Sequence, residues 1–256
     1  MTDAAERPRG DGRGFAGGRS VIFAAIAGVL LGAGAVALWA GAGASENSRA
    51  DVEAIVRDYV LANPEIIPEA MRRLEDRERG EVVDANRSAF ETPFGAAWAG
   101  AADGDVVLVE FFDYACGYCR KSNADVERLL KEDPKLKVVW REWPVLGPDS
   151  ELAAQASLAA ARQGRFRDYY ARLFELGRPT AQTIAQAQQA AGVSPQLVAQ
   201  MKGSAAVRDE LVKNHELAQA IRASGTPTFV VGDRVLQGAV GYDKLKEAIA
   251  AARTKA

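Results

Sequence analysis

The stretch that most restricts the possible folds is VVLVEFF, Val106–Phe112, which is followed closely by the only two cysteines of the chain, Cys116 and Cys119. The run is short, β-branched and aromatic, and only Glu110 interrupts it, so it predicts a buried strand. NADVERLLKED then predicts a helix, and LKVVWREW, residues 136–143, predicts a second strand. Strand, helix and strand in this order predict the βαβ unit of a parallel sheet, and therefore an α/β fold.

Helices and one hairpin follow this unit. From about residue 149 to 222 the chain is rich in Ala, Gln, Leu and Arg, which predicts an inserted helical domain with turns at GRPT and GVSP. Five residues at helical spacing are predicted to form its core: Phe166, Tyr169, Tyr170, Leu173 and Phe174. The segments PTFVV and RVLQG flank Gly232-Asp233, which predicts a two-residue hairpin. A last helix is predicted from Tyr242 to about Arg253.

The N-terminal part contains a long uncharged segment, residues 21–44, with nine Ala and five Gly among its 24 residues. This length suffices to cross a hydrocarbon core of about 30 Å. The segment predicts either an uncleaved transmembrane anchor or a signal segment cleaved at AGA, residues 42–44. Residues 1–20 carry four arginines, so they are predicted to be a cytoplasmic leader, with everything after Ser45 outside.

Residues 45–90 are predicted to form a helical arm. Val52, Ile55, Val56, Tyr59 and Val60 recur at helical spacing, Asn63-Pro64 interrupts the helix, and an apolar stripe resumes beyond Pro68 before the charged stretch RRLEDRERGE. Such a stripe predicts either packing on the chain's own domain or a homo-oligomer formed through the arm. The second domain is predicted to span residues 91–256.

Charge and cysteine content exclude several classes of function. The formal net charge is −2 and no basic patch stands out, so nucleic acid is not an expected partner. Two cysteines do not build the disulfide framework of a small secreted scaffold, and a chain of 256 residues has no need of one. The pair is therefore predicted to serve chemistry.

A Cys-x-x-Cys pair at a strand-to-helix junction places the first sulfur at a helix N-terminus, where free N–H groups favour a thiolate. Cys116 is predicted to be the exposed attacking thiolate, with Arg120 and Lys121 nearby, and Cys119, one turn inside, the resolving thiol. Glu110 is predicted either to be a buried acid that exchanges protons with Cys119 or to face solvent from an edge strand.

Metal binding is the rival interpretation of the two thiols. A structural zinc site takes four ligands, whereas this chain has no second Cys-x-x-Cys, and its only histidine, His215, is predicted to be an ordinary surface residue. No metal or other cofactor is expected. Two soft thiolates could still hold Cu(I), which keeps a copper-handling protein as the alternative function.

The motif VEFFDYACGYC together with GTPTFVVG, residues 225–232, resembles the DsbA-type thiol-disulfide oxidoreductases with a thioredoxin fold. The resemblance covers about residues 106–252 and implies a cis Thr226-Pro227 bond against the redox pair, with Thr226 contacting the reactive sulfur. The dipeptide Gly117-Tyr118 resembles that of disulfide isomerases, and with Thr226 it is predicted to bind substrate. VRDYVLANPEII resembles the N-terminal extension of ScsC-type proteins, some of which trimerise.

The resemblance implies a protein of the bacterial cell envelope, either anchored in the inner membrane or soluble in the periplasm. Its predicted activity is to form or reshuffle disulfides in exported proteins, as an oxidase or an isomerase. Its predicted partners are cysteine-containing exported proteins, a membrane redox partner that resets the pair, and the membrane itself if residues 21–44 stay uncleaved. The residues do not distinguish an oxidase from an isomerase.

Overall fold

The structure, a computed structural model, describes residues 47–255, and the chain divides into two compact units, Met1–Pro68 and Glu69–Ala256. The predicted leader, residues 1–20, and the predicted anchor or signal segment, residues 21–44, lie outside the described residues. Within residues 47–255, no helix combines the length and the apolar character needed to cross a membrane. Both interpretations of residues 21–44 therefore stay predictions.

Helix α2 (Asn47–Ala62) ends where the sequence predicts an interruption. The Asn63 side chain donates to the carbonyl oxygen of Tyr59 at 2.8 Å, and helix α3 (Ile66–Ala85) begins after Pro64. Pro68 lies in the first turn of α3, where a missing N–H costs no helical hydrogen bond. The large apolar side chains of these two helices that stay exposed are Val52, Ile55, Val56, Tyr59, Leu61, Ile67, Met71 and Leu74.

Helix α3 belongs to the larger unit from Glu69 onward. Gly80 and Val83 are buried, and a Cβ atom on Gly80 would lie only 2.8 Å from the carbonyl oxygen of Asp233. The short helix α4 (Arg87–Glu91) follows and buries Phe90, whose ring packs edge-on against Phe111 at 6.0 Å. Gly80, Val83 and Phe90 thus contribute to the core of the larger unit.

A five-stranded sheet forms the centre of this unit, in the order β1-β3-β2-β4-β5. Its strands are β1 (Trp98–Gly100), β2 (Val106–Phe112), β3 (Leu136–Glu142), β4 (Thr228–Val231) and β5 (Arg234–Gln237). Strands β2 and β3 pair in parallel and the other neighbours are antiparallel. The predicted βαβ unit and hairpin are confirmed, whereas β1, only three residues long, was not predicted.

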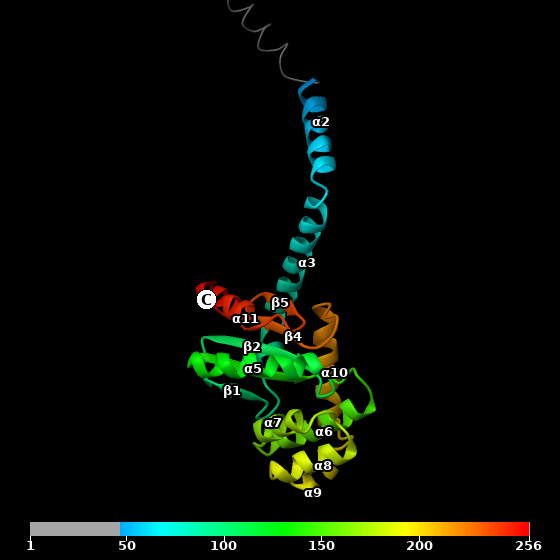
Figure 1. Cartoon of the computed structure of the whole chain (residues 1–256), viewed down its shortest axis with the longest axis vertical. Helices are drawn as coiled ribbons and strands as arrows, with labels where there is room; N and C mark the ends of the chain where they lie inside the picture. Colours follow the sequence, from blue (N-terminus) through cyan, green and yellow to red (C-terminus); the bar gives the residue numbers. More distant parts are fainter. Residues whose placement is uncertain (1–46, 256) are drawn as a thin grey trace, which may run out of the picture. The chain divides into compact units, whose positions relative to one another are not determined.

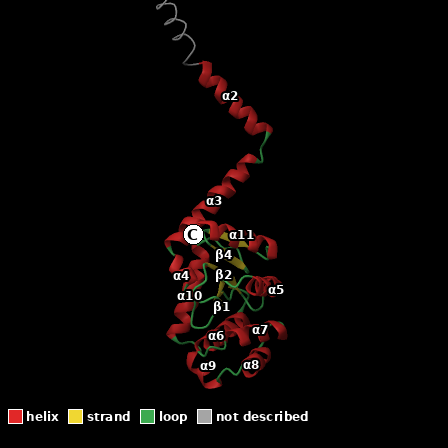
Figure 2. Cartoon of the chain, turned by 90° about the vertical axis from the view of Figure 1, so that its left-hand side faces the viewer, coloured by secondary structure: helices red, strands yellow, loops and turns green. Residues whose placement is uncertain are grey.

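The two faces of the sheet are covered by different helices, as Figure 2 shows for α5 (Gly117–Glu132) on one side and α4 and α10 (Ala205–Ala220) on the other. Alternate residues of β2 face opposite sides. Leu108 and Phe112 pack in the core with α5 and α11 (Tyr242–Lys255), whereas Val109 and Phe111 pack in the core with α4 and α10. Because β2 lies between β3 and β4, all of its residues except the half-buried Val107 are buried.

The predicted helical insertion is confirmed between β3 and β4. Its helices are α6 (Pro148–Arg162), α7 (Phe166–Leu176), α8 (Ala181–Ala190), α9 (Pro195–Met201) and α10 (Ala205–Ala220). In Figure 1, α6 to α9 gather in one group below the sheet. The five predicted core residues of the insertion, from Phe166 to Phe174, are all buried in α7.

Candidate active site

The two cysteines lie where β2 gives way to α5. Cys116 is the N-cap residue of α5, and its Sγ accepts a hydrogen bond from the backbone N–H of Cys119 at 3.4 Å. Both are free thiols. The prediction that Cys116 is exposed is wrong in degree, since only 6% of the residue is accessible against 0% of Cys119. The loop carrying Thr226 covers it, a tertiary contact that local sequence does not indicate.

The pKa values of the two thiols are shifted in opposite directions. The pKa of Cys116 falls to about 5, chiefly because the Cys119 thiol donates a hydrogen bond to its sulfur, with further help from backbone N–H groups of the first turn. The pKa of Cys119 rises, mainly through burial. Arg120 and Lys121 are exposed and are not the main cause. In neutral solution Cys116 is therefore a thiolate and Cys119 a thiol, as attack and resolution require.

The second segment of the site comes from the loop between α10 and β4. The Thr226-Pro227 peptide bond is cis. The Thr226 carbonyl oxygen lies 3.2 Å from Cys116 Sγ and accepts a hydrogen bond from the thiol form. The Pro227 carbonyl oxygen in turn accepts from Gly238 N–H at 2.8 Å, which ties the loop to the end of β5. Residues 110 apart in sequence thus meet at one sulfur.

Glu110 lies in the middle of β2 and is completely buried. Its Oε2 accepts a hydrogen bond from Trp140 Nε1 at 2.9 Å, and its Oε1 has no partner among the described residues. Burial raises the pKa of Glu110 to about 8, and the charge on Cys116 adds to this rise. The edge-strand alternative is wrong because β2 is an interior strand.

Sequence reasoning gave no role to Asp113, although it lies inside the motif. Its carboxylate is 1% exposed and accepts four hydrogen bonds, from Ala115 N at 2.7 Å, Val145 N at 2.9 Å, Leu146 N at 3.0 Å and Ser150 Oγ at 2.7 Å. Its carbonyl oxygen accepts from Cys116 N–H at 3.0 Å. Asp113 therefore joins the cysteine loop to the loop after β3. An Asp directly after a buried strand was the available signal.

The two residues between the cysteines are open to solvent. Gly117 is exposed, and a Cβ atom there would meet nothing within 4 Å. Tyr118 is 68% exposed. Val145 and Leu146, whose backbone N–H groups donate to the Asp113 carboxylate, are 44% and 51% exposed. The surroundings of Cys116 thus include several accessible apolar side chains.

His215 does not join the cysteines in a metal site. It is exposed on α10, and its Nδ1 accepts a hydrogen bond from Trp143 Nε1 at 3.2 Å. Within residues 47–255 no group of three or more His, Cys, Asp or Glu side chains could hold a metal ion.

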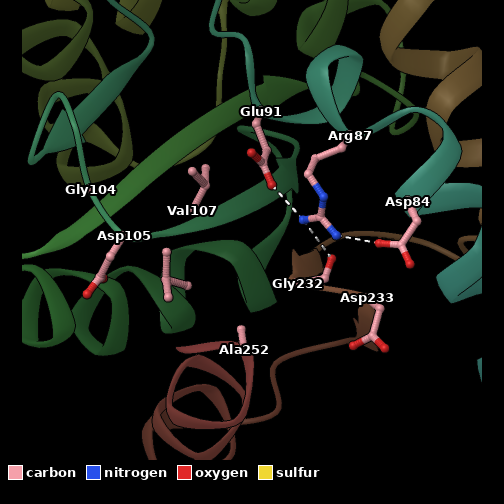
Figure 3. Close-up of a pocket in the computed structure, with 10 residues that line it drawn as sticks. Asp84, Arg87, Glu91, Gly104, Asp105, Val107, Gly232, Asp233 and Ala252 are labelled. Atoms are coloured by element: carbon pink, nitrogen blue, oxygen red, sulfur yellow. Dashed lines mark hydrogen bonds and ion pairs between the residues drawn. The ribbon is translucent and has the colours of Figure 1, made fainter. Parts of the chain in front are cut away.

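A polar pocket of about 470 Å³ lies away from these residues, at the end of β2 where Val106 begins the strand. Figure 3 shows Arg87 between Asp84 and Glu91, with which it forms ion pairs, and Gly232 nearby. The cysteines follow the opposite end of β2. None of the predicted site residues lines this pocket.

Comparison with known proteins agrees with this geometry. The family description "DSBA-like thioredoxin domain" matches residues 107–250, more than half of the chain. The chain belongs to this DsbA-like family of thiol-disulfide oxidoreductases. The N-terminal domain of copper resistance protein ScsC matches residues 49–81, which agrees with the predicted ScsC-like extension.

Individual relatives are similar over most of the chain. Disulfide bond formation protein D of Bacillus subtilis is 27% identical over 163 residues, which cover 59% of this chain and 73% of that protein. A thioredoxin-like oxidoreductase from Silicibacter pomeroyi is 35% identical with a TM-score of 0.64, covering 67% of this chain and 99% of that chain. A linker-deletion mutant of Proteus mirabilis ScsC is 26% identical with a TM-score of 0.63, covering 84% and 99%.

Proposed function

We propose that this protein is a cell-envelope thiol-disulfide oxidoreductase that exchanges disulfides with cysteines of exported proteins through Cys116 and Cys119. The observation that carries the proposal is the contrast at the start of α5. The pKa of Cys116 is lowered to about 5, whereas that of Cys119, one turn further, is raised. A nucleophile that is ionised beside a resolving thiol that is not ionised suits sequential exchange.

In the reducing direction, the Cys116 thiolate attacks one sulfur of a substrate disulfide and the other substrate sulfur leaves as a thiolate. Cys119 then gives its proton to Glu110 in its carboxylate form, which is the minor form in neutral solution because burial raises the pKa of Glu110 to about 8, and attacks the Cys116 sulfur. This forms the Cys116–Cys119 disulfide and releases the substrate with both cysteines reduced. In the oxidising direction every step reverses: a substrate thiolate attacks Cys116, the Cys116–Cys119 bond breaks, and Cys119 takes the proton from Glu110 as it leaves.

The substrate is proposed to be a polypeptide with an accessible cysteine. Tyr118, Val145 and Leu146 are exposed apolar side chains near the cysteine loop, and Thr226 offers backbone groups next to the sulfur. Apolar surface of this kind suits incompletely folded chains, which expose apolar side chains themselves. Exported proteins meet this enzyme before their disulfides are complete.

A location in the bacterial envelope fits two observations. A periplasmic thioredoxin-like protein from Salmonella enterica is 27% identical to this chain, and residues 21–44 form an uncharged segment after an arginine-bearing leader. A membrane redox partner is proposed to restore the redox state of the cysteines after each turnover.

The central test replaces Cys116 with Ser and, separately, Cys119 with Ser. Cys116→Ser is expected to abolish both the reduction of insulin and the oxidation of a dithiol peptide. Cys119→Ser is expected to keep the first attack and to accumulate a mixed disulfide visible by mass spectrometry. Turnover by Cys116→Ser at the wild-type rate would refute the proposal.

Isomerase rather than oxidase activity is proposed if the arm assembles several chains around a shared space. Light scattering on the full chain and on a chain beginning at Glu69 tests the assembly, because residues after this point belong to the catalytic unit. Ile55→Asp and Tyr59→Asp in the apolar stripe are expected to dissociate an oligomer, whereas Arg57→Asp on the same helix is not. A monomeric full chain would contradict the isomerase version.

Cu(I) handling is the second candidate, favoured by two thiols in hydrogen-bond contact and by the match to a domain named for copper resistance. The raised pKa of Cys119 opposes it, because both sulfurs would have to ionise. Titrating the reduced protein with Cu(I) against a competing chelator decides the matter. Binding at one site per chain that Cys119→Ser removes would support it, and no competition would reject it.

A further inference from the structure

An ion pair links the inserted helical domain to the helix that carries the cysteines. Arg167 of α7 pairs through Nη2 with Glu127 of α5. Its guanidinium carbon also lies 4.5 Å from the ring centroid of Trp140, on β3. The Arg167 Nη1 atom is buried and has no hydrogen-bond partner among the described residues. The cation is therefore partly withdrawn from water and held against an indole face.

The same indole ring contacts the buried acid of the site. Trp140 Nε1 donates to Glu110 Oε2 at 2.9 Å, so Arg167, Trp140 and Glu110 form a continuous series from the protein surface to the centre of the sheet. The side chain of Arg167 is 32% exposed and that of Glu127 is 52% exposed. The outer end of the series is therefore accessible to solvent and the inner end is not.

The ionisable groups that face Glu110 come from two helices. Helix α5 contributes Cys116, Cys119 and Glu127, and helix α7 contributes Arg167 and Tyr170. The neighbouring strands contribute Trp140 from β3 and Phe229 from β4, neither of which titrates. Arg167 lowers the pKa of Glu110 and Glu127 raises it, so the two members of the ion pair act in opposite directions.

We propose that Arg167 is a positioning residue for the proton transfer at Glu110, acting across Trp140, and that its pairing with Glu127 lets the inserted helical domain control the resolving step. The inference rests on the proposed role of Glu110 in accepting the Cys119 proton. In this arrangement, contacts that draw Arg167 toward or away from Glu127 change the charge that Glu110 experiences. The helical domain thereby affects the chemistry without touching either sulfur.

The experiment separates the two exchange steps by mixing reduced full-length protein with 5,5′-dithiobis(2-nitrobenzoate). Attack by Cys116 releases one coloured thiolate, and attack by Cys119 on the resulting mixed disulfide releases the second. The pH dependence of the second release reports proton transfer from Cys119. The variants are Arg167→Met, Glu127→Gln, Arg167→Lys and, as a matched control, Arg172→Met, which removes another α7 arginine that pairs with Glu175.

Arg167→Met is expected to move the midpoint of the second release to higher pH, and Glu127→Gln to lower pH, each by roughly one pH unit. Arg167→Lys keeps the charge and is expected to restore most of the Arg167→Met shift, while Arg172→Met leaves the midpoint in place. A merely structural ion pair would give shifts of the same sign, or none. Either result overturns the proposal.

Glu110→Gln distinguishes failure of this inference from failure of the proposed mechanism. If Glu110→Gln leaves the midpoint of the second release unchanged, the proposed role of Glu110 is wrong and the inference falls with it. If Glu110→Gln abolishes that midpoint while Arg167→Met and Glu127→Gln do not move it, only the inference is wrong. Should Arg167→Met not fold, as judged by circular dichroism, the opposite shift in Glu127→Gln still decides.

Discussion

Replacing Glu110 with Gln removes a fully buried carboxyl group and changes the side-chain shape little. Burial raises the pKa of Glu110 from 4.5 to about 8, so folding in neutral solution requires this group to bind a proton that the unfolded chain does not hold. A carboxyl whose folded pKa is raised contributes its full stability below the unfolded pKa, and this contribution is lost as the pH rises through the folded pKa. The contribution of Glu110 to wild-type stability is therefore expected to fall between about pH 4.5 and about pH 8.

The magnitude follows from the two pKa values. Their difference, 8 minus 4.5, is about 3.5, and at about 1.4 kcal/mol for each pKa unit the loss reaches roughly 5 kcal/mol above pH 8. At about pH 7 it amounts to roughly 3 kcal/mol. Gln has no such titration. Its amide oxygen still accepts the Trp140 N–H, while its NH₂ group occupies the position of the unpartnered Oε1, which adds an offset independent of pH.

The assay is urea unfolding of the reduced full-length protein over a series of pH values, for wild type, Glu110→Gln and the exposed Glu151→Gln as a control for the loss of one charge. The difference in unfolding free energy between Glu110→Gln and wild type is expected to grow with pH and then level off. All three proteins are measured in the reduced state, so that Cys116 and Cys119 are free thiols in each. Parallel stability curves for wild type and Glu110→Gln would refute the inference that this carboxyl is buried and protonated in neutral solution.

Three further outcomes are expected. Cys119→Ala should raise the pKa of Cys116 more than Cys119→Ser does, because the serine hydroxyl can still donate to the Cys116 sulfur; the ultraviolet absorbance of the thiolate against pH measures both. Asp113→Ala should cost about 3–5 kcal/mol of stability, since it removes a buried carboxylate that accepts four hydrogen bonds. Ser150→Ala, which removes one of these four donors, should cost about 1 kcal/mol in the same denaturant titration. Arg141→Met should cost about 3–5 kcal/mol by thermal or urea unfolding, because it removes the buried donor to three carbonyl groups and to the Glu210 carboxylate, which keeps only its longer ion pair with Lys213.

The central strand and the cysteine pair could be predicted because their signals are local. A continuous β-branched and aromatic run, Val106–Phe112, has few alternatives to a buried strand, and a Cys-x-x-Cys pair after it has few alternatives to a helix start. The βαβ unit followed from chain order alone. Strand β1 was missed because three residues, Trp98–Gly100, are too short to show a period of two.

What could not be predicted depends on partners that are remote in sequence. Arg141 lies within the second predicted strand and is 1% exposed. Carbonyl groups of Ala89, Phe90 and Thr92 and the Glu210 carboxylate surround its guanidinium. No feature of the strand indicates that the end of a helix some 50 residues earlier supplies those acceptors. The covering of Cys116 by Thr226 is of the same kind, and only the family resemblance indicated it.

Strand β2 explains why opposite pKa shifts occur so close together. Glu110 lies inside the strand, where water is excluded and the neutral form of a carboxyl is favoured, so burial raises its pKa to about 8. Six residues later Cys116 lies at the start of α5, where N–H groups without helical partners and the Cys119 thiol favour the anion and lower its pKa to about 5. Strand β2 thus places Glu110, which accepts a proton near neutral pH, within electrostatic range of Cys116, which ionises at a much lower pH. Disulfide exchange uses both groups. Cys116 must be ionised to attack the substrate, and Cys119 must then give its proton to Glu110.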